Sequence, residues 1–130
     1  MGIKNNMEKK KILIVEDEAT LQRALSEFLA LENFEVVNAL DGESGVEMAK
    51  KARPDLILLD IILPKKDGYE VIDDLRAEKE TKDIPIILLT NLETSENITK
   101  AFEKGIKTYL VKSDYKLEEV VKKIKDALKM

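Results

Sequence analysis

The residues best suited to chemistry are acids, a hydroxyl and a lysine, and they stand at the ends of short apolar runs. They are Glu16, Asp17, Glu18, Asp60, Thr90 and Lys112. Carboxylates brought close together repel one another unless a cation lies among them. A hard divalent ion meets that demand, and Mg²⁺ typically takes one or two carboxylates, some waters and phosphate oxygens. The pattern therefore indicates a divalent-cation site, provided that the fold brings these residues together.

Taken one at a time, the same residues have ordinary structural interpretations. A lone Asp60 is more often a solvated turn residue or a helix cap than a nucleophile. The acids at 16–18 also favour the start of a helix, Thr90 could cap the segment after it, and Lys112 could be a surface charge. Only their placement together at one edge of a sheet favours a functional site.

The elements that would position these residues alternate along the chain. Short runs of branched aliphatics predict strands, and amphipathic stretches of ten or more residues predict helices. The expected strands are residues 12–15, 34–37, 56–59, 86–89 and 108–111, and the expected helices include residues 21–29, 42–51, 69–77, 94–104 and 117–128. This alternation predicts a doubly wound α/β domain with a parallel sheet covered on both faces. Such sheets bind ligands at the carboxyl ends of their strands, where the polar residues stand.

Length, charge and composition limit the function classes. A chain of 130 residues is about one domain long, and we expect residues 1–10 to be a flexible extension and residues 11–130 to form the domain. The net charge of -4 offers no footprint for a nucleic-acid backbone, so we expect no direct nucleic-acid contact. The absence of Cys and His excludes disulfides, thiolate metal sites and histidine bases. The longest apolar runs are strand-sized, so we expect no membrane contact and a cytoplasmic location.

Four segments carry a resemblance to a known family. They are ILIVEDE, PDLILLDIILPKKDG, PIILLTN and YLVKS, in that order along the chain. From Lys11 to about Leu128 the sequence resembles bacterial response-regulator receiver domains of two-component signalling, including those of the chemotaxis type. The resemblance implies a (βα)5 flavodoxin-like three-layer sandwich whose five parallel strands have the order 2-1-3-4-5.

The resemblance also implies the site. Asp60 is the expected phospho-acceptor, and Asp17 and Asp60 are expected to ligate Mg²⁺, or Mn²⁺ in its place, with the backbone carbonyl of Ile62. Glu16 is expected to act mainly through water or to assist coordination. The carboxylate of Asp60 would attack phosphorus in line, while the metal and Lys112 offset charge on the phosphoryl oxygens.

A switch follows from the same resemblance. The hydroxyl of Thr90 would swing to a phosphoryl oxygen and let Tyr109 turn inward, which reshapes the surface of the fourth helix, fifth strand and fifth helix. The fourth helix, expected at 94–104, is rich in poor helix formers, so we expect it to be the easiest to move. From the residues alone, Tyr109 is equally a half-buried strand aromatic.

The sequence departs from the family pattern beside the site. Asn91, rather than a small residue, follows the hydroxyl residue, and Ser113, rather than proline, follows Lys112. The latter leaves the isomer of the Lys112–Ser113 bond open, because a non-proline cis bond costs about 3 kcal/mol. Ser113 or Asp114 is a candidate cap for the last helix.

Two apolar positions next to the site bear on the lifetime of the phosphoryl group. Ile62 and Leu92 stand where receivers that lose phosphate quickly tend to carry polar side chains that orient water. We therefore expect a long-lived phosphoryl group. The alternative is that both side chains merely extend the hydrophobic edge of the site.

Other classes of protein share parts of this pattern. A phosphatase of the haloacid-dehalogenase type needs a second Asp where Ile62 stands, and a flavodoxin needs a Gly- or Ser/Thr-rich phosphate loop that the acidic segment VEDEATLQ does not provide. The main alternative is a non-phosphorylated pseudo-receiver that serves as an interaction module. The expected partners are a sensor histidine kinase or phosphotransfer protein, a downstream effector or further output domain, and, on phosphorylation, a second copy of the chain.

Overall fold

The computed structural model describes residues 8–130. The first seven residues of the expected N-terminal extension lie outside this part of the chain. Residues 8–10 are exposed and lead directly into the first strand. None of the described helices is long and apolar enough to cross a membrane.

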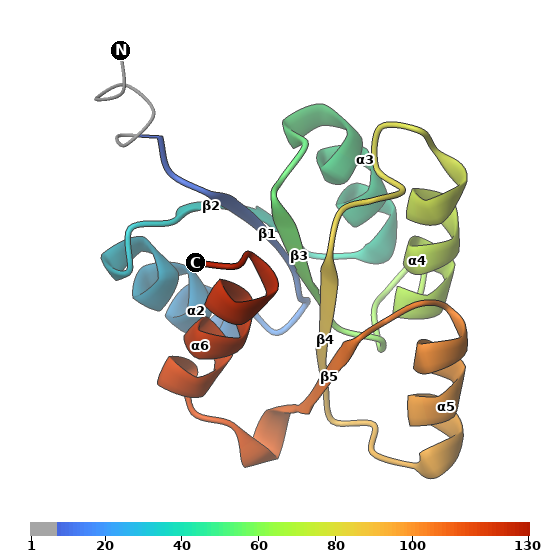
Figure 1. The fold of residues 1–130 in the computed structure, drawn as a ribbon. Coiled ribbons are helices and arrows are strands. Elements are labelled where there is room, and N and C mark those ends of the chain that lie inside the picture. Colours follow the sequence, from blue (N-terminus) through green and yellow to red (C-terminus); the bar gives the residue numbers. More distant parts are fainter. Residues whose placement is uncertain (1–7) are drawn as a thin grey trace.

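Strands and helices alternate around one five-stranded sheet (Figure 1). In chain order the elements are β1 (Lys11–Val15), α2 (Ala19–Leu31), β2 (Glu35–Ala39), α3 (Gly42–Ala52), β3 (Leu56–Leu59), α4 (Gly68–Ala77), β4 (Ile86–Thr90), α5 (Ser95–Glu103), β5 (Thr108–Val111), a short 3₁₀ helix (Lys112–Asp114) and α6 (Leu117–Ala127). All strand pairs are parallel, and the strand order is β2-β1-β3-β4-β5. The fold class and strand order predicted from the sequence are confirmed.

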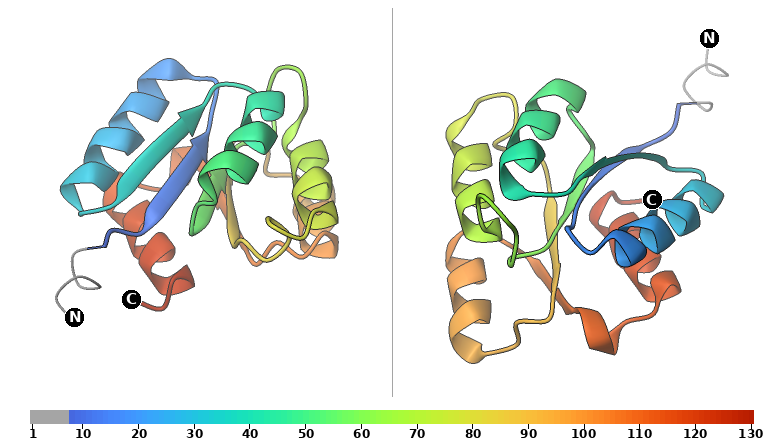
Figure 2. Two further views of the ribbon diagram at one scale, coloured as in Figure 1. Left: turned by 90° about the horizontal axis from the view of Figure 1, so that it is seen from above. Right: turned by 180° about the vertical axis from the view of Figure 1, so that it is seen from behind.

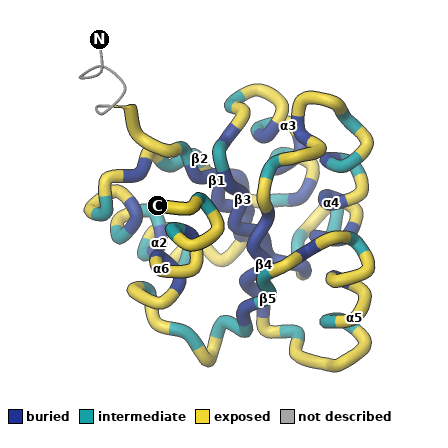
Figure 3. Tube along the Cα trace, viewed as in Figure 1, coloured by how far each residue is buried: buried dark blue, intermediate teal, exposed yellow. Residues whose placement is uncertain are grey.

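The helices cover the sheet on both faces and make three layers (Figures 1 and 2). Side chains alternate between the two faces of a strand, so neighbouring residues enter different cores. Leu13 and Ile57 pack in the core under α3, α4 and α5, whereas Ile12 and Leu58 pack in the core under α2 and α6. The central strand β3 is therefore apolar and buried at every position, and the middle of the sheet is dark blue in Figure 3.

The strand register brings the chemically capable residues to one edge. Val15 pairs with Leu59 across β1 and β3, and the amide of Asp60 donates to the carbonyl of Val15 at 3.1 Å. Thr90 at the end of β4 pairs with Val111 at the end of β5. The residues after β1, β3 and β5 and the last residue of β4 therefore meet at the carboxyl edge of the sheet.

The second strand begins one residue later than predicted and extends further. Phe34 was expected to open this strand because aromatic residues favour strands, but it is a buried core residue before β2. Asn33 has a left-handed backbone with φ 71°, and the amide of Phe34 donates to the carbonyl of Leu29 at 3.1 Å. The end of α2 thus includes Phe34 in its own closing turn.

The connection from β5 to the last helix also differs from expectation. The Lys112–Ser113 bond is trans, and residues 112–114 form the 3₁₀ helix. Neither Ser113 nor Asp114 caps the last helix, so that prediction is wrong. The cap position of α6 is Lys116, whose amide donates to the side chain of Glu119 at 3.1 Å.

Candidate functional site

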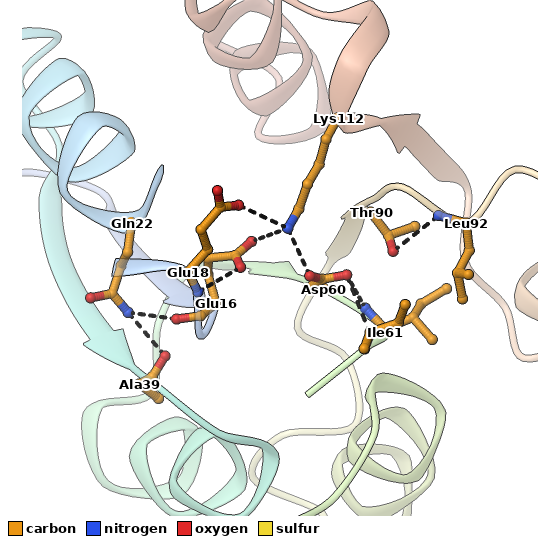
Figure 4. Close-up of polar contacts among 10 residues, drawn as sticks. Glu16, Glu18, Gln22, Ala39, Asp60, Ile61, Thr90, Leu92 and Lys112 are labelled. Carbon is orange, nitrogen blue, oxygen red and sulfur yellow. Dashed lines mark hydrogen bonds and ion pairs between the residues drawn. The ribbon is translucent and has the colours of Figure 1, made fainter. Parts of the chain in front are cut away.

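The ammonium group of Lys112 lies between two buried carboxylates at the carboxyl edge of the sheet (Figure 4). Its Nζ is 2.8 Å from Oδ2 of Asp60 and 2.8 Å from Oε1 of Glu16, with the exposed carboxylate of Glu18 at 3.9 Å. Glu16 and Asp60 are only 3% and 5% exposed. Residues that follow β1, β3 and β5 therefore form one ionic cluster.

Burial and pairing act on this cluster in opposite directions. Burial raises the pKa of Glu16 above its usual 4.5, although its contacts with Lys112 and with the amide of Glu18 partly offset that effect. Burial by itself would lower the pKa of Lys112, but its hydrogen bonds to Asp60 and Glu16 outweigh burial, and its pKa is raised. Lys112 therefore stays charged and is the counter-ion for both acids.

The loop after β3 orients the other carboxylate oxygen of Asp60. Its Oδ1 accepts hydrogen bonds from the amide of Ile61 at 2.7 Å and from the amide of Ile62 at 3.3 Å. The loop packs tightly against the start of α4, because a Cβ on Gly68 would lie 2.5 Å from the carbonyl oxygen of Asp60. The carboxylate is thus fixed on one oxygen by backbone amides and on the other by Lys112.

An acidic cluster at the same edge fits a hard divalent cation. Carboxylate oxygens of Glu16, Asp17 and Asp60 all lie within 4.8 Å of one another. Asp17 is exposed while the other two are buried, which leaves one side of the cluster open to water. Ile62 lies in the adjoining loop and is 59% exposed. Oxygen ligands next to open coordination positions are the surroundings that Mg²⁺ prefers.

A second polar group lies at the end of β4. Oγ1 of the fully buried Thr90 accepts from the amide of Leu92 at 3.4 Å, and the hydroxyl of Tyr109 donates to the carbonyl of Leu92 at 2.5 Å. Burial raises the pKa of Tyr109 to about 12. In the part of the chain that the structure describes, no hydrogen bond joins this group to the Lys112 cluster. The backbone of Leu92 connects Thr90 to Tyr109.

The residues around these two groups differ in exposure. The side chain of Leu92 packs against the core under α3, α4 and α5, whereas that of Ile62 faces solvent. Asn91 is exposed. Of the two apolar positions that the sequence linked to phosphate lifetime, Ile62 is exposed to water in the loop after Asp60, whereas Leu92 is only partly exposed.

Sequence reasoning missed a polar contact between α4 and α5, which we call the α4–α5 seam. The hydroxyl of Tyr69 donates to Oδ1 of Asn97 at 2.7 Å, and Nζ of Lys100 lies 4.3 Å from the centre of the Tyr69 ring. Asp73 and Lys104 form an ion pair of 2.8 Å further along. Only Ala101 is fully buried in α5, so these polar contacts add to a small apolar contact between the helix and the core.

Gln22 was also not identified from the sequence. Its side-chain amide binds the backbone beside the acidic cluster. The sequence signal was a long amide side chain six residues after Glu16, at the start of an expected helix. That signal is weak without the strand arrangement.

Comparison with known proteins assigns the family. A family model for the response regulator receiver domain matches residues 12–125. The chain therefore belongs to the response regulator receiver domain family, as its resemblance predicted.

Two relatives with similar sequences are regulators longer than this chain. The chain is 42% identical over 107 residues to the "Probable transcriptional regulator ycf27" of Porphyridium aerugineum, which covers 82% of this chain and 43% of that protein. It is 39% identical over 119 residues to the "Transcriptional regulatory protein ResD" of Bacillus subtilis, which covers 92% of this chain and 48% of that protein. The chain thus spans less than half the length of these relatives.

Solved structures agree with the fold. The chemotaxis protein CheY4 of Vibrio cholerae matches with a TM-score of 0.85 at 28% identity, over 92% of this chain and 98% of that chain. The phosphorylated cyanobacterial phytochrome response regulator RcpA matches with a TM-score of 0.79 at 32% identity, over 92% of this chain and 93% of that chain.

Proposed function

We propose that this receiver domain takes a phosphoryl group onto Asp60 in a reaction that depends on Mg²⁺ or Mn²⁺. The observation that carries the proposal is the carboxylate of Asp60, which is buried at the strand edge, held by Lys112 and placed next to two further acids. An ion pair of Asp60 with Lys112 needs no such cluster, because the second buried carboxylate of Glu16 costs free energy and the nearby charge of Asp17 adds repulsion unless a cation offsets them. A site that receives both a cation and a phosphoryl group explains why the acids are gathered.

The residues divide the chemistry among them. An oxygen of Asp60 forms a bond to phosphorus, the bond from phosphorus to the donor breaks, and its electron pair leaves with the donor. Lys112 stays close enough to bind a phosphoryl oxygen, and the amides of Ile61 and Ile62 keep the carboxylate oriented. When bound, the metal adds positive charge that offsets the charge of the phosphoryl oxygens.

Four groups would hold that metal. The carboxylates of Asp17 and Asp60 and the backbone carbonyl of Ile62 are the proposed direct ligands, and Glu16 is proposed to act through water. The close approach of the three carboxylates supports this assignment.

Phosphorylation would act on the rest of the domain through Thr90 and Tyr109. A phosphoryl oxygen is a strong acceptor for the hydroxyl of Thr90, and a move toward it weakens the contact with the amide of Leu92. Because the carbonyl of Leu92 holds Tyr109, the change reaches the surface formed by α5, β5 and α6. The small buried face of α5 supports its role as the element that moves.

The proposed partners follow from this surface and from the length of the relatives. A sensor histidine kinase, a phosphotransfer protein or a small phosphodonor supplies the phosphoryl group, and the α5–β5–α6 surface signals to an effector, to an output domain or to a second copy. The chain acts as a phospho-acceptor in the cytoplasm, without itself contacting nucleic acid or membrane. Its net charge of -4 supports the absence of direct nucleic-acid contact.

The test is incubation with Mg²⁺ and acetyl phosphate, followed by intact-mass measurement over time. We expect a single phosphoryl adduct on the wild type and on Asp126→Asn, a control at an exposed acid of α6. Asp60→Asn, and the wild type in EDTA, should show none. No adduct on a folded wild type would instead favour the pseudo-receiver, which acts only as an interaction module.

A further inference from the structure

The side chain of Gln22, in the first turn of α2, reaches back to the carboxyl ends of β1 and β2 (Figure 4). Its Nε2 donates hydrogen bonds to the backbone carbonyl of Glu16 at 3.1 Å and to that of Ala39 at 3.0 Å. A carboxamide nitrogen carries two donors, so these bonds use both. Gln22 therefore ties the loop after β1 to the end of β2.

A further bond completes the restraint on this loop. The amide of Glu16 donates to the same carbonyl of Ala39 at 3.1 Å, so the backbone of Glu16 is held at both its N–H and its C=O. That C=O belongs to the planar peptide unit that joins Glu16 to Asp17. The bond to the carbonyl oxygen of Glu16 therefore sets the orientation of this peptide plane, and with it the direction in which the chain continues to Asp17.

Asp17 is the member of the acidic cluster that most needs such a restraint. Lys112 lies 2.8 Å from the carboxylates of Glu16 and Asp60, whereas Asp17 is exposed and lies outside that pair. The three acids lie within 4.8 Å of one another, and like charges at this range repel. An unrestrained loop would turn Asp17 outward, where water solvates its charge.

We infer that Gln22 is a positioning residue of the divalent-cation site. By holding the Glu16–Asp17 peptide, it keeps the carboxylate of Asp17 beside those of Glu16 and Asp60 before the cation arrives. The inference rests on the proposed function, because it requires that the acidic cluster bind a cation. Removing a residue that orients a metal ligand through hydrogen bonds typically lowers metal affinity about tenfold or more.

The experiment measures Mn²⁺ affinity by electron paramagnetic resonance, together with thermal stability in EDTA. Gln22→Met keeps the length of the side chain and removes both donors, and we expect it to weaken Mn²⁺ binding about tenfold. Gln22→Arg restores a long donor, so its affinity should exceed that of Gln22→Met even though its positive charge opposes the cation. The matched control is Ser26→Ala, which removes the 3.1 Å bond from Ser26 to Asn38, another contact between α2 and β2.

The result that supports the inference is weaker Mn²⁺ binding in Gln22→Met but not in Ser26→Ala, whatever the loss of stability in each. Equal affinity in the wild type and Gln22→Met overturns it. Equal weakening in Ser26→Ala also overturns it, because general loosening of α2 then explains the effect. A wild type that binds no Mn²⁺ removes the proposed cation site itself, which is a separate failure from that of Gln22.

Discussion

The hydroxyl of Tyr109 donates to the backbone carbonyl of Leu92 at 2.5 Å, which joins the centre of β5 to the loop after β4. Burial of this hydroxyl raises its pKa from 10.0 to about 12. Tyr109 therefore keeps its proton, and with it the hydrogen bond, at every pH where the domain is expected to work.

The first prediction concerns this titration. Because the folded pKa is above the unfolded one, the associated stability is fully present below about pH 10 and is lost as pH rises through about 12. In a spectrophotometric tyrosine titration, Tyr109→Phe should lose the component that titrates last. From pH 10 upward, the free energy of unfolding should fall more steeply in the wild type than in the variant. Identical titration curves would contradict the assignment.

A second prediction concerns Lys112 as the counter-ion of Glu16 and Asp60. Lys112→Met leaves two buried carboxylates without a cation, so without divalent metal the free energy of unfolding should fall by about 3 kcal/mol in urea. Burial raises the pKa of Glu16, so its neutral form, present at low pH, is the better tolerated one. The difference in free energy of unfolding between the wild type and Lys112→Met should therefore become smaller as pH falls, and also when Mg²⁺ is added.

The control for Lys112 is Lys122→Met on α6. Lys122 pairs with Asp126 at 3.4 Å, and both side chains are largely exposed. Loss of such a pair changes stability by less than about 1 kcal/mol. A similar effect of the two substitutions would show that the buried cluster is not held by Lys112.

A third prediction uses the tight contact under Asp60. Gly68→Ala places a Cβ 2.5 Å from the carbonyl oxygen of Asp60 and 2.7 Å from the Cα of Ile61, and these backbone atoms cannot rotate away. We expect a loss of about 1–3 kcal/mol in stability and slower formation of the phosphoryl adduct. Gly105→Ala is the control: its φ of 87° strains alanine, but nothing lies within 4 Å of the new Cβ. It should lose stability and keep the wild-type rate of phosphorylation.

The α4–α5 seam gives a fourth prediction. Tyr69→Phe keeps the ring under Lys100 and removes the hydrogen bond to Asn97, which is worth about 1 kcal/mol. Local opening of α5 should become about fivefold more frequent, and hydrogen exchange of its amides should speed up by the same factor. Tyr115→Phe, on the opposite face of the sheet, is the control and should leave α5 unchanged.

The sequence predicted the site residues that strand pairing places, but not those placed by the packing of a helix on the sheet. Asp60 and Lys112 were predicted to meet because each follows an apolar strand, and the parallel pairing of β3 and β5 with β4 brings such residues to one edge. Gln22 was missed because its bonds depend on how α2 lies over two strands, and no periodicity of the sequence records that placement.

The boundaries that were wrong have local causes. Phe34 was expected in the second strand from its β-propensity. The left-handed backbone of Asn33 instead turns the chain so that Phe34 enters the core within the turn, and the strand begins only at Glu35. Ser113 and Asp114 are good capping types, but the 3₁₀ helix after β5 includes both of them and moves the cap of α6 to Lys116. In both places a turn that joins two elements overrode the preference of a single residue.

The last prediction concerns the lifetime of the phosphoryl group. Ile62 is two residues after Asp60, its amide donates to Oδ1 of Asp60, and the residue is 59% exposed. The side chain at this position can therefore shield Asp60 from an attacking water or help to orient that water. Ile62→Asn replaces the apolar side chain with a smaller carboxamide that can orient water, and we expect dephosphorylation about tenfold faster, equivalent to about 1.4 kcal/mol in the barrier. Loss of the adduct after gel filtration, followed by intact mass, measures the rate. Ile62→Val should remain close to wild type, and a wild-type adduct that decays within seconds would remove the premise that this site is slow.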